Sequence, residues 1–145
     1  MDCFQDVAKH CLFAKTRTVS RFVTNVYTKA LKDIGLTAVQ YSMLTAILML
    51  KRSNINDLSS VLKMDRTTIN RNLKPLVRDG LVYVDESADR REKIVMITKE
   101  GEAIYKKGYE NWKAAQEMLK ETLGEPLWDE MHETLDKVIA VIAKQ

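Results

Sequence analysis

The stretch of sequence that decides the fold is 54–98, which reads NINDLSSVLKMDRTTINRNLKPLVRDGLVYVDESADRREKIVMIT. It contains two short segments of helical periodicity, then two runs of β-forming residues around a polar loop. The second helix is predicted to begin at Asp65, whose carboxylate can accept the free amide hydrogens of a first turn, and to end before Gly80. Its predicted buried face consists of Ile69, Leu73, Leu76 and Val77.

Another face of this predicted helix is basic and polar and carries no acid. It is formed by Thr67, Asn70, Arg71, Lys74 and Arg78. Arginine and lysine suit guanine edges and phosphates, asparagine suits adenine, and threonine can contact a thymine methyl group. The face therefore has the chemistry of a helix that lies in a major groove, although an ordinary solvated face can look the same. Pro75 is expected to kink or loosen the helix beyond the residues that would contact bases.

The preceding segment is predicted to form a helix over 55–63, capped by Asn54 or Asn56. A short turn at Lys63 and Met64 joins the two helices, which is the helix-turn-helix pattern. After Gly80, residues 81–84 and 94–97 are predicted to form a β-hairpin.

The loop of the predicted hairpin, 85–93, carries two adjacent arginines, Arg90 and Arg91. An arginine at such a tip can enter a minor groove, where narrow A·T tracts concentrate negative potential. Asp89 could hold Arg91 in an extended pose. The alternative is a solvated charged turn.

Together these motifs resemble the winged helix-turn-helix of the MarR family of bacterial transcription regulators. The matching residues are 65–73 (DRTTINRNL), the junction 79–82 (DGLV), the wing residues 89–91 (DRR) followed by 94–98 (IVMIT), and 35–37 with Gln40. The resemblance implies a homodimer that binds a palindromic operator in double-stranded DNA, with recognition helices in successive major grooves and wing arginines in the flanking minor grooves. It also implies DNA contacts by Arg66, Thr67, Thr68, Asn70 and Arg71, and makes Arg91 the wing arginine, with Asp89 as its partner. Lys74, Arg78 and Arg90 complete the predicted DNA-binding set.

Length and composition suit one domain, 1–145, of mostly α structure with a small β-hairpin. The net charge is only +3, but basic residues concentrate in 54–98 while the segment from Glu117 onward is acidic. No apolar run approaches the ~18 residues of a transmembrane helix. The N-terminal residues lack the pattern of a signal peptide, so a cytoplasmic location and no membrane partner are expected.

Long helices are predicted on both sides of this unit. The first covers 2–34 and ends before Gly35, and a further helix, with a capping box of Thr37 and Gln40, ends near Leu50. Beyond the hairpin, Thr98 should cap a helix that reaches Leu123. The last helix, after a break at 124–126, carries an apolar seam formed by Leu127, Met131, Leu135, Val138 and Ile142. We therefore expect 2–34 and 99–145 to form a dimer interface around a winged helix-turn-helix region at 37–98.

Two modes of signal sensing, and one different class of function, stay open. The resemblance implies a small aromatic or phenolic ligand, with candidate lining residues Arg17, Arg21, Tyr41, Met43, Tyr109 and Trp112, although the aromatic residues and Met43 also suit plain core packing. Some MarR-family regulators instead sense hydroperoxides through a reactive cysteine, for which Cys11 is the candidate, with Tyr27 and Tyr41 as partners. The sequence around Cys11 departs from that branch, and a buried structural cysteine is its ordinary role. The different class is a winged helix that docks proteins and does not bind DNA.

The two cysteines and two histidines do not form a recognisable catalytic or metal motif. Cys3 and Cys11, on one helix, would lie about 12 Å apart along its axis, too far for a disulfide. His10 and His132 are distant in sequence, which makes a structural zinc site improbable. With neither a glycine-rich phosphate loop nor a nucleophile elbow, the sequence predicts no enzymatic activity, no cofactor and no metal.

Overall fold

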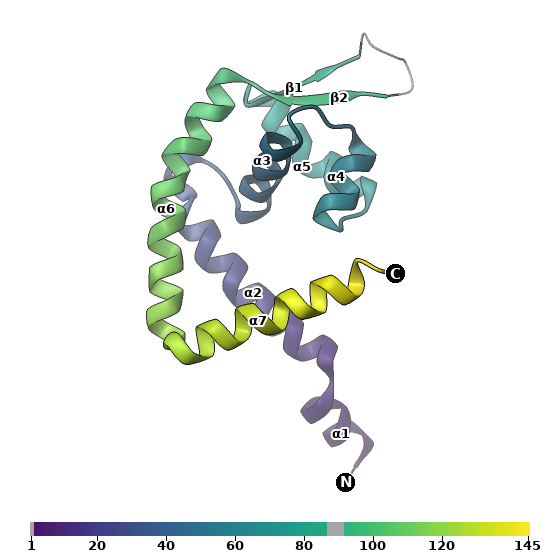
Figure 1. Cartoon of the computed structure of the whole chain (residues 1–145), viewed down its shortest axis with the longest axis vertical. Helices are drawn as coiled ribbons and strands as arrows, with labels where there is room; N and C mark the ends of the chain where they lie inside the picture. Colours follow the sequence, from purple (N-terminus) through teal and green to yellow (C-terminus); the bar gives the residue numbers. More distant parts are fainter. Residues whose placement is uncertain (1, 87–91) are drawn as a thin grey trace.

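A small winged unit lies at one end of a frame of long helices (Figure 1). The computed structural model describes residues 2–86 and 92–145. In chain order its elements are α1 (Cys3–His10), α2 (Leu12–Ala30), the 3-10 helix η1 (Lys32–Ile34), α3 (Ala38–Leu50), α4 (Ile55–Leu62), α5 (Arg66–Arg78), β1 (Val82–Asp85), β2 (Ile94–Ile97), α6 (Lys99–Leu123) and α7 (Glu125–Ile142). The predicted mostly α fold with one β-hairpin is confirmed.

Hydrogen-bonded caps set the starts of the helices around the winged unit. The Thr37 side chain accepts from the Gln40 amide at 3.2 Å and the Gln40 side chain accepts from the Thr37 amide at 2.9 Å, which completes the predicted capping box of α3. Asn54, and not Asn56, caps α4 in a reciprocal pair with Asp57. These caps satisfy amide hydrogens that have no partner inside the helix.

The N-terminal segment corrects one prediction, because residues 2–34 do not form a single helix. The backbone is extended at Cys11 (φ −66°, ψ 108°), which separates α1 from α2. No residue of α1 or α2, both of which are fully described, is buried. A helical segment as short as α1 is marginal without packing, and no residue of α1 is buried against the other described elements.

The core of the winged unit surrounds α3. Its fully buried side chains include Met43, Leu44, Ile47, Leu58, Ile69, Leu76, Val82 and Val95. The strands β1 and β2 are antiparallel, with Val82 opposite Ile97 and Asp85 opposite Ile94. The backbone of Ser53 bridges to Val95, which ties the loop after α3 to the edge of the hairpin. The unit therefore has a buried core, which also includes Leu31 directly after α2.

The helix α6 connects this unit to the frame and packs along α2. The Asn111 side chain donates to the carbonyl of Ala30 at 2.8 Å, and the Tyr27 hydroxyl donates to Gln116 Oε1 at 2.7 Å. A side chain at Gly108 would meet atoms of Ile34 and Tyr41 at 2.7 Å, so only glycine permits this close approach.

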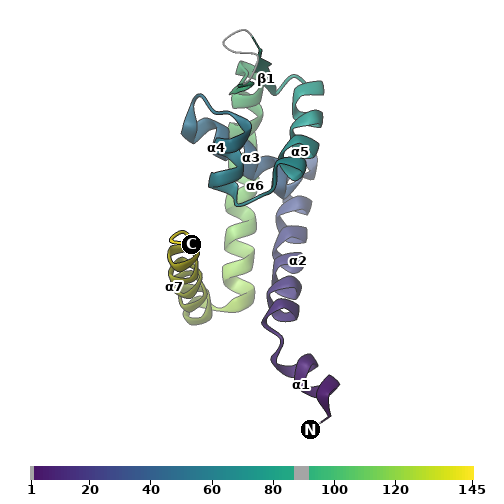
Figure 2. The same cartoon turned by 90° about the vertical axis from the view of Figure 1, so that its right-hand side faces the viewer.

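The chain turns back at Gly124 into α7, which stands apart from α2 (Figure 2). None of the described helices is long and apolar enough to cross a membrane.

Candidate functional site

The first turn of α5 is organised by Asp65. Its carboxylate accepts from the Thr68 amide at 2.8 Å and from the Thr68 hydroxyl at 2.7 Å. These hydrogen bonds from Thr68 hold the pKa of Asp65 below its ordinary value. Thr68, a predicted DNA contact, therefore uses its hydroxyl proton to complete the cap. The hydroxyl oxygen and the methyl group of Thr68 are therefore the groups that could contact DNA.

The inner face of α5 is formed by Ile69, Leu73 and Leu76, which are buried as predicted. Val77 is not, because 40% of it is exposed. At about 100° per residue, position 77 lies roughly 80° around the helix from position 69. That rotation carries Val77 out of the narrow face that packs on α3 and β1. The helix itself runs through Pro75 to Arg78.

The outer face of α5 brings the predicted polar and basic side chains together. Arg66, Thr67, Asn70, Arg71, Lys74 and Arg78 are all exposed. The Asn70 side chain donates to the Arg66 carbonyl at 2.9 Å, which leaves its own carbonyl oxygen accessible.

The cations of this face differ in whether their charge is already paired. Within the described part of the chain, Arg71 and Lys74 have neither a hydrogen bond nor an ion pair from their side chains. Arg78 differs, because its guanidinium pairs with Asp79 through contacts of 2.8 and 3.2 Å. This pair raises the pKa of Arg78 and lowers that of Asp79. The middle of α5 therefore presents uncompensated positive charge, and its end does not.

The wing residues Asp89, Arg90 and Arg91 lie outside the described residues, so their predicted role stays a prediction. On the described flanks of this loop, Lys93 Nζ lies 3.0 Å from Glu86 Oε1. This ion pair joins the two sides of the hairpin beyond the last paired residues of β1 and β2.

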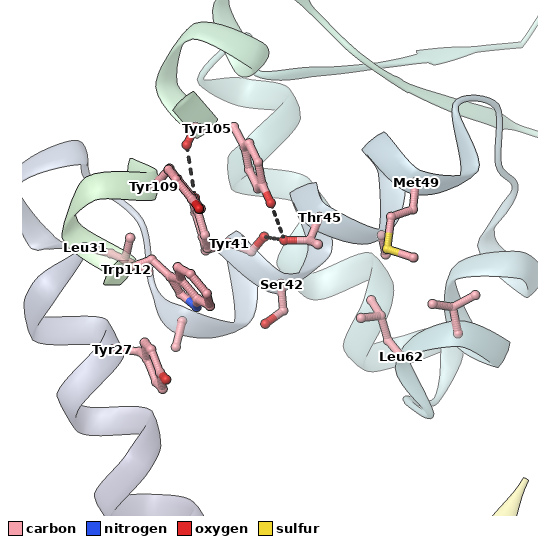
Figure 3. A pocket seen from close by; sticks show the side chains of 13 residues that line it. Tyr27, Leu31, Tyr41, Ser42, Thr45, Met49, Leu62, Tyr105, Tyr109 and Trp112 are labelled. Atoms are coloured by element: carbon pink, nitrogen blue, oxygen red, sulfur yellow. Dashed lines mark hydrogen bonds between the residues drawn. The ribbon is translucent and has the colours of Figure 1, made fainter. Parts of the chain in front are cut away.

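A second candidate site is a cavity of about 520 Å³ bounded by α2, α3, α4 and α6 (Figure 3). Its lining residues are Tyr27, Leu31, Ala38, Tyr41, Ser42, Thr45, Ala46, Met49, Val61, Leu62, Tyr105, Tyr109 and Trp112. Both its volume and its largely apolar lining are typical of small-molecule sites. Because α3 and α4 belong to the winged unit and α2 and α6 to the frame, the cavity lies where the two parts meet.

The structure brings only part of the predicted ligand set into this cavity. Tyr41, Tyr109 and Trp112 line it. Arg17 and Arg21 lie outside it on the exposed surface of α2, where the Arg21 Nε donates to the Arg17 carbonyl at 3.3 Å. Met43 is fully buried in the core of the winged unit and also does not line the cavity. The aromatic part of the set is thus gathered, and the cationic part is not.

Tyr105 lines the cavity but was not among the predicted ligand residues. Its ring stacks on Tyr41 with centroids 4.7 Å apart and an interplanar angle of 9°. The Tyr41 hydroxyl donates to the Tyr105 carbonyl at 3.1 Å, and Thr45 contributes a further hydroxyl from α3. The available signal was the aromatic repeat at 105, 109 and 112, which follows helical spacing.

Ionisation is disfavoured in this cavity. Burial, with a smaller contribution from Tyr105, raises the pKa of Tyr41 to about 12. Burial also raises the pKa of Tyr27. Both shifts have the same cause, which is that the phenolate loses hydration without gaining a cationic neighbour.

Cys11 lies at the break between α1 and α2 and is not part of the cavity. It is a partly buried free thiol, and Cys3 is an exposed one. The nearby His10 pairs with Asp6 at 2.8 Å on the surface of α1. Across residues 2–86 and 92–145 no group of His, Cys, Asp and Glu side chains could hold a metal ion.

Comparison with known proteins places these features in a family. The family described as "Sugar-specific transcriptional regulator TrmB" matches residues 31–106. The uncharacterized HTH-type transcriptional regulator YwoH of Bacillus subtilis is 29% identical over 86 residues, which span 59% of this chain and 63% of YwoH, less than two thirds of that protein.

Two solved structures extend the match to nearly the whole chain. The transcriptional regulator MosR of M. tuberculosis, in complex with DNA, is 30% identical, with a TM-score of 0.75 over 91% of this chain and 98% of that one. A mutant of MarR from E. coli, complexed with operator DNA, shares the fold, with 22% identity and a TM-score of 0.81 over 95% and 99% of the two chains. The chain therefore belongs to the MarR family of winged helix-turn-helix transcription regulators, and its winged unit is also matched by the TrmB family.

Proposed function

We propose that this protein is a homodimeric repressor that binds a palindromic operator in double-stranded DNA through α5 and the wing. The observation that carries the proposal is the outer face of α5, where Arg71 and Lys74 are exposed and have no acidic partner in the described chain. Uncompensated cations on a helix with a buried opposite face suit phosphate and base contacts. The complex of MosR with DNA supports the same use of the fold.

The proposed dimer assigns residues 2–34 and 99–145 to subunit contacts and 37–98 to reading DNA. Its support is the exposure of large apolar side chains on α1, α2 and α7. They include Phe4, Phe13, Phe22, Leu135 and Ile139. The two winged units of one dimer then bind half-sites that lie about one turn of the DNA helix apart. A regulator of this kind works in the cytoplasm, where bacterial DNA is found.

Repression is proposed to end when a small aromatic molecule enters the cavity of Figure 3. The cavity is bounded by α3 and α4 on one side and by α2 and α6 on the other. A ligand that binds one separation of these helices better than another shifts the population of DNA-binding dimers. The coupling therefore has a physical route from the cavity through α4 to α5, which directly follows it in the helix-turn-helix.

The first test is selection of random duplex DNA by the purified protein at physiological salt. The expected result is a palindrome whose half-sites are one turn apart, bound with a steep salt dependence. A folded, dimeric, ligand-free protein that selects no motif would contradict the proposal. It would favour the interaction-module alternative.

Two arginines of α5 provide a matched pair of variants. Arg71→Ala should change the preferred base at one position of each half-site and weaken binding by about 1–3 kcal/mol. Arg78→Ala should lower overall affinity less and leave the motif unchanged, because Asp79 already pairs with that guanidinium. Equal effects of the two substitutions would contradict the proposed orientation of α5.

The same assay tests the wing. Arg91→Ala is expected to weaken operator binding strongly, and Asp89→Ala less so. If both variants bind as the parent protein does, the wing assignment fails while the assignment of α5 stands.

A further inference from the structure

The lining of the cavity in Figure 3 is aromatic, aliphatic and hydroxylic. Among the residues that the structure describes, no lysine, arginine or histidine lines it. The cation beside it is Lys113, whose Nζ lies 5.1 Å from the centre of the Tyr109 ring. Lys113 is itself exposed and paired with Glu110 at 2.8 Å, so its charge is already compensated at the surface. The described residues that line the cavity therefore offer an anion no counter-charge.

Three hydroxyl protons in the cavity are already in use. The Tyr41 hydroxyl donates to the Tyr105 carbonyl and the Tyr27 hydroxyl to Gln116. The Thr45 hydroxyl donates to the Tyr41 carbonyl at 3.0 Å. What these groups still offer a ligand is oxygen lone pairs, which accept hydrogen bonds. A ligand that carries an N–H or O–H donor can use them, and a carboxylate, which has only acceptors, cannot.

Other groups in the lining can donate, namely the hydroxyls of Ser42, Tyr105 and Tyr109 and the indole of Trp112. The Trp112 indole N–H has no hydrogen-bond partner in the described part of the chain, and its ring stands among the lining side chains (Figure 3). Neutral donors such as these can bind a carbonyl or phenol oxygen, but they do not replace the ion pair that a buried carboxylate requires. The polar groups thus match an uncharged molecule that carries both donors and acceptors.

We infer that this cavity binds uncharged aromatic molecules that carry a hydrogen-bond donor and excludes aromatic carboxylates of the same size. The inference rests on the proposed function, in which a small aromatic ligand occupies this site, and it specifies the ligand's charge. The raised pKa of Tyr41, to about 12, has the same origin, since a phenolate at that position meets the same lack of hydration and counter-charge.

Isothermal titration calorimetry on the full-length protein at pH 7.5 tests this with two isosteric pairs. These are 4-hydroxybenzamide against 4-hydroxybenzoate, and 3-phenylpropanamide against 3-phenylpropanoate. In each pair the amide keeps the shape of the acid but replaces a charged acceptor with an N–H donor. The amide is expected to bind at least 10-fold more tightly than its carboxylate.

A substitution at the rim of the cavity should change this preference. Met49 lines the cavity but is 75% exposed, so Met49→Lys adds a cation without burying it. This variant should raise carboxylate affinity at least 10-fold relative to amide affinity. Met118→Lys is the control, because Met118 is an exposed methionine of α6 that does not line the cavity. It should leave both affinities unchanged.

The possible results separate this inference from the proposed function. Tighter binding of the carboxylates by the parent protein overturns the inference alone, since an aromatic ligand would still be sensed. If the amides bind but Met49→Lys and Met118→Lys show the same preference for amide over carboxylate, the ligand lies elsewhere. That result also overturns the inference. If the amides bind as expected but do not release operator DNA, the proposed mode of release fails and the inference stands. Failure of all four compounds to bind the folded dimer overturns the inference and the proposed mode of release, while operator selection remains the test of DNA binding.

Discussion

The helices α5 and α7 have similar apolar patterns and opposite environments. The inner residues of α5 are buried, with Ile69 at 0% exposure, while Leu135 and Ile139 of α7 are 48% and 60% exposed. The difference lies in the neighbours, because α5 packs on α3, α4 and β1, whereas α7 contacts mainly α6. An apolar repeat thus predicts that a helix face becomes buried, but not which chain covers it.

This contrast divides the molecule into a winged unit whose apolar faces are mostly buried and a frame of long helices whose apolar faces are exposed. The winged unit has a closed core, a bridged hairpin and capped helices. The frame ends in two exposed apolar surfaces, on α1 with the first half of α2 and on α7. Exposed apolar area of this extent usually marks an interaction surface. The following predictions test whether the two parts respond differently to substitution.

The largest expected effect comes from placing charge on the apolar face of α7. The double variant Leu135→Glu and Ile139→Glu should be monomeric by sedimentation while the winged unit stays folded. Because two linked reading heads bind far more tightly than one, operator affinity should fall about 100-fold or more.

Lys137→Glu is the control on the same helix, since position 137 points roughly 160° away from position 135. It should remain dimeric. A double variant that still sediments as a dimer would show that the exposed face of α7 is not the subunit interface.

Truncation inside the winged unit should affect stability according to burial. Ile69→Ala creates a cavity in a packed core and should lower the free energy of unfolding by about 2–5 kcal/mol. Val77→Ala, on the same helix but 40% exposed, should change it by no more than about 0.5 kcal/mol. Urea denaturation at one fixed protein concentration measures both, because dimerisation also contributes to stability. Equal losses would mean that Val77 is covered in the dimer.

Local signals in the sequence predicted much of the fold. The caps at Thr37, Asp65 and Thr98 all form as expected, because each depends on hydrogen bonds to residues three positions away. The hairpin and the exposed polar face of α5 were predicted for the same reason, since periodicity within one element determines them. The match with MosR extends this to the whole architecture.

Features that depend on contacts between distant segments were not predictable in the same way. The break at Cys11 occurs where neighbouring elements do not support a continuous helix, and the local sequence there contains neither proline nor glycine. The cavity depends on how α2, α3, α4 and α6 meet, so only the structure shows that Tyr105 and Thr45 line it. Arg17 and Arg21 were predicted to line the ligand site, but the fold places them outside it.

The smallest expected effect concerns the start of α5 and depends on pH. The pKa of Asp65 is lower in the folded protein than its ordinary value, through the hydrogen bonds from Thr68. The ionised carboxylate therefore stabilises the folded state fully above the unfolded pKa, near ~3.9, and this contribution is lost as the pH falls through the folded pKa.

Thermal unfolding from pH 7 to pH 3 should accordingly show Asp65→Ala less stable than the parent at neutral pH, with the gap closing below about pH 4. Asp65→Asn separates the two roles of this residue, since asparagine can cap a helix but does not titrate. It should stay close to the parent at neutral pH, and its difference from Asp65→Ala should not change with pH. If the gap between the parent and Asp65→Ala instead persists unchanged at pH 3, the carboxylate charge contributes nothing to the cap, and α5 depends on its buried face alone.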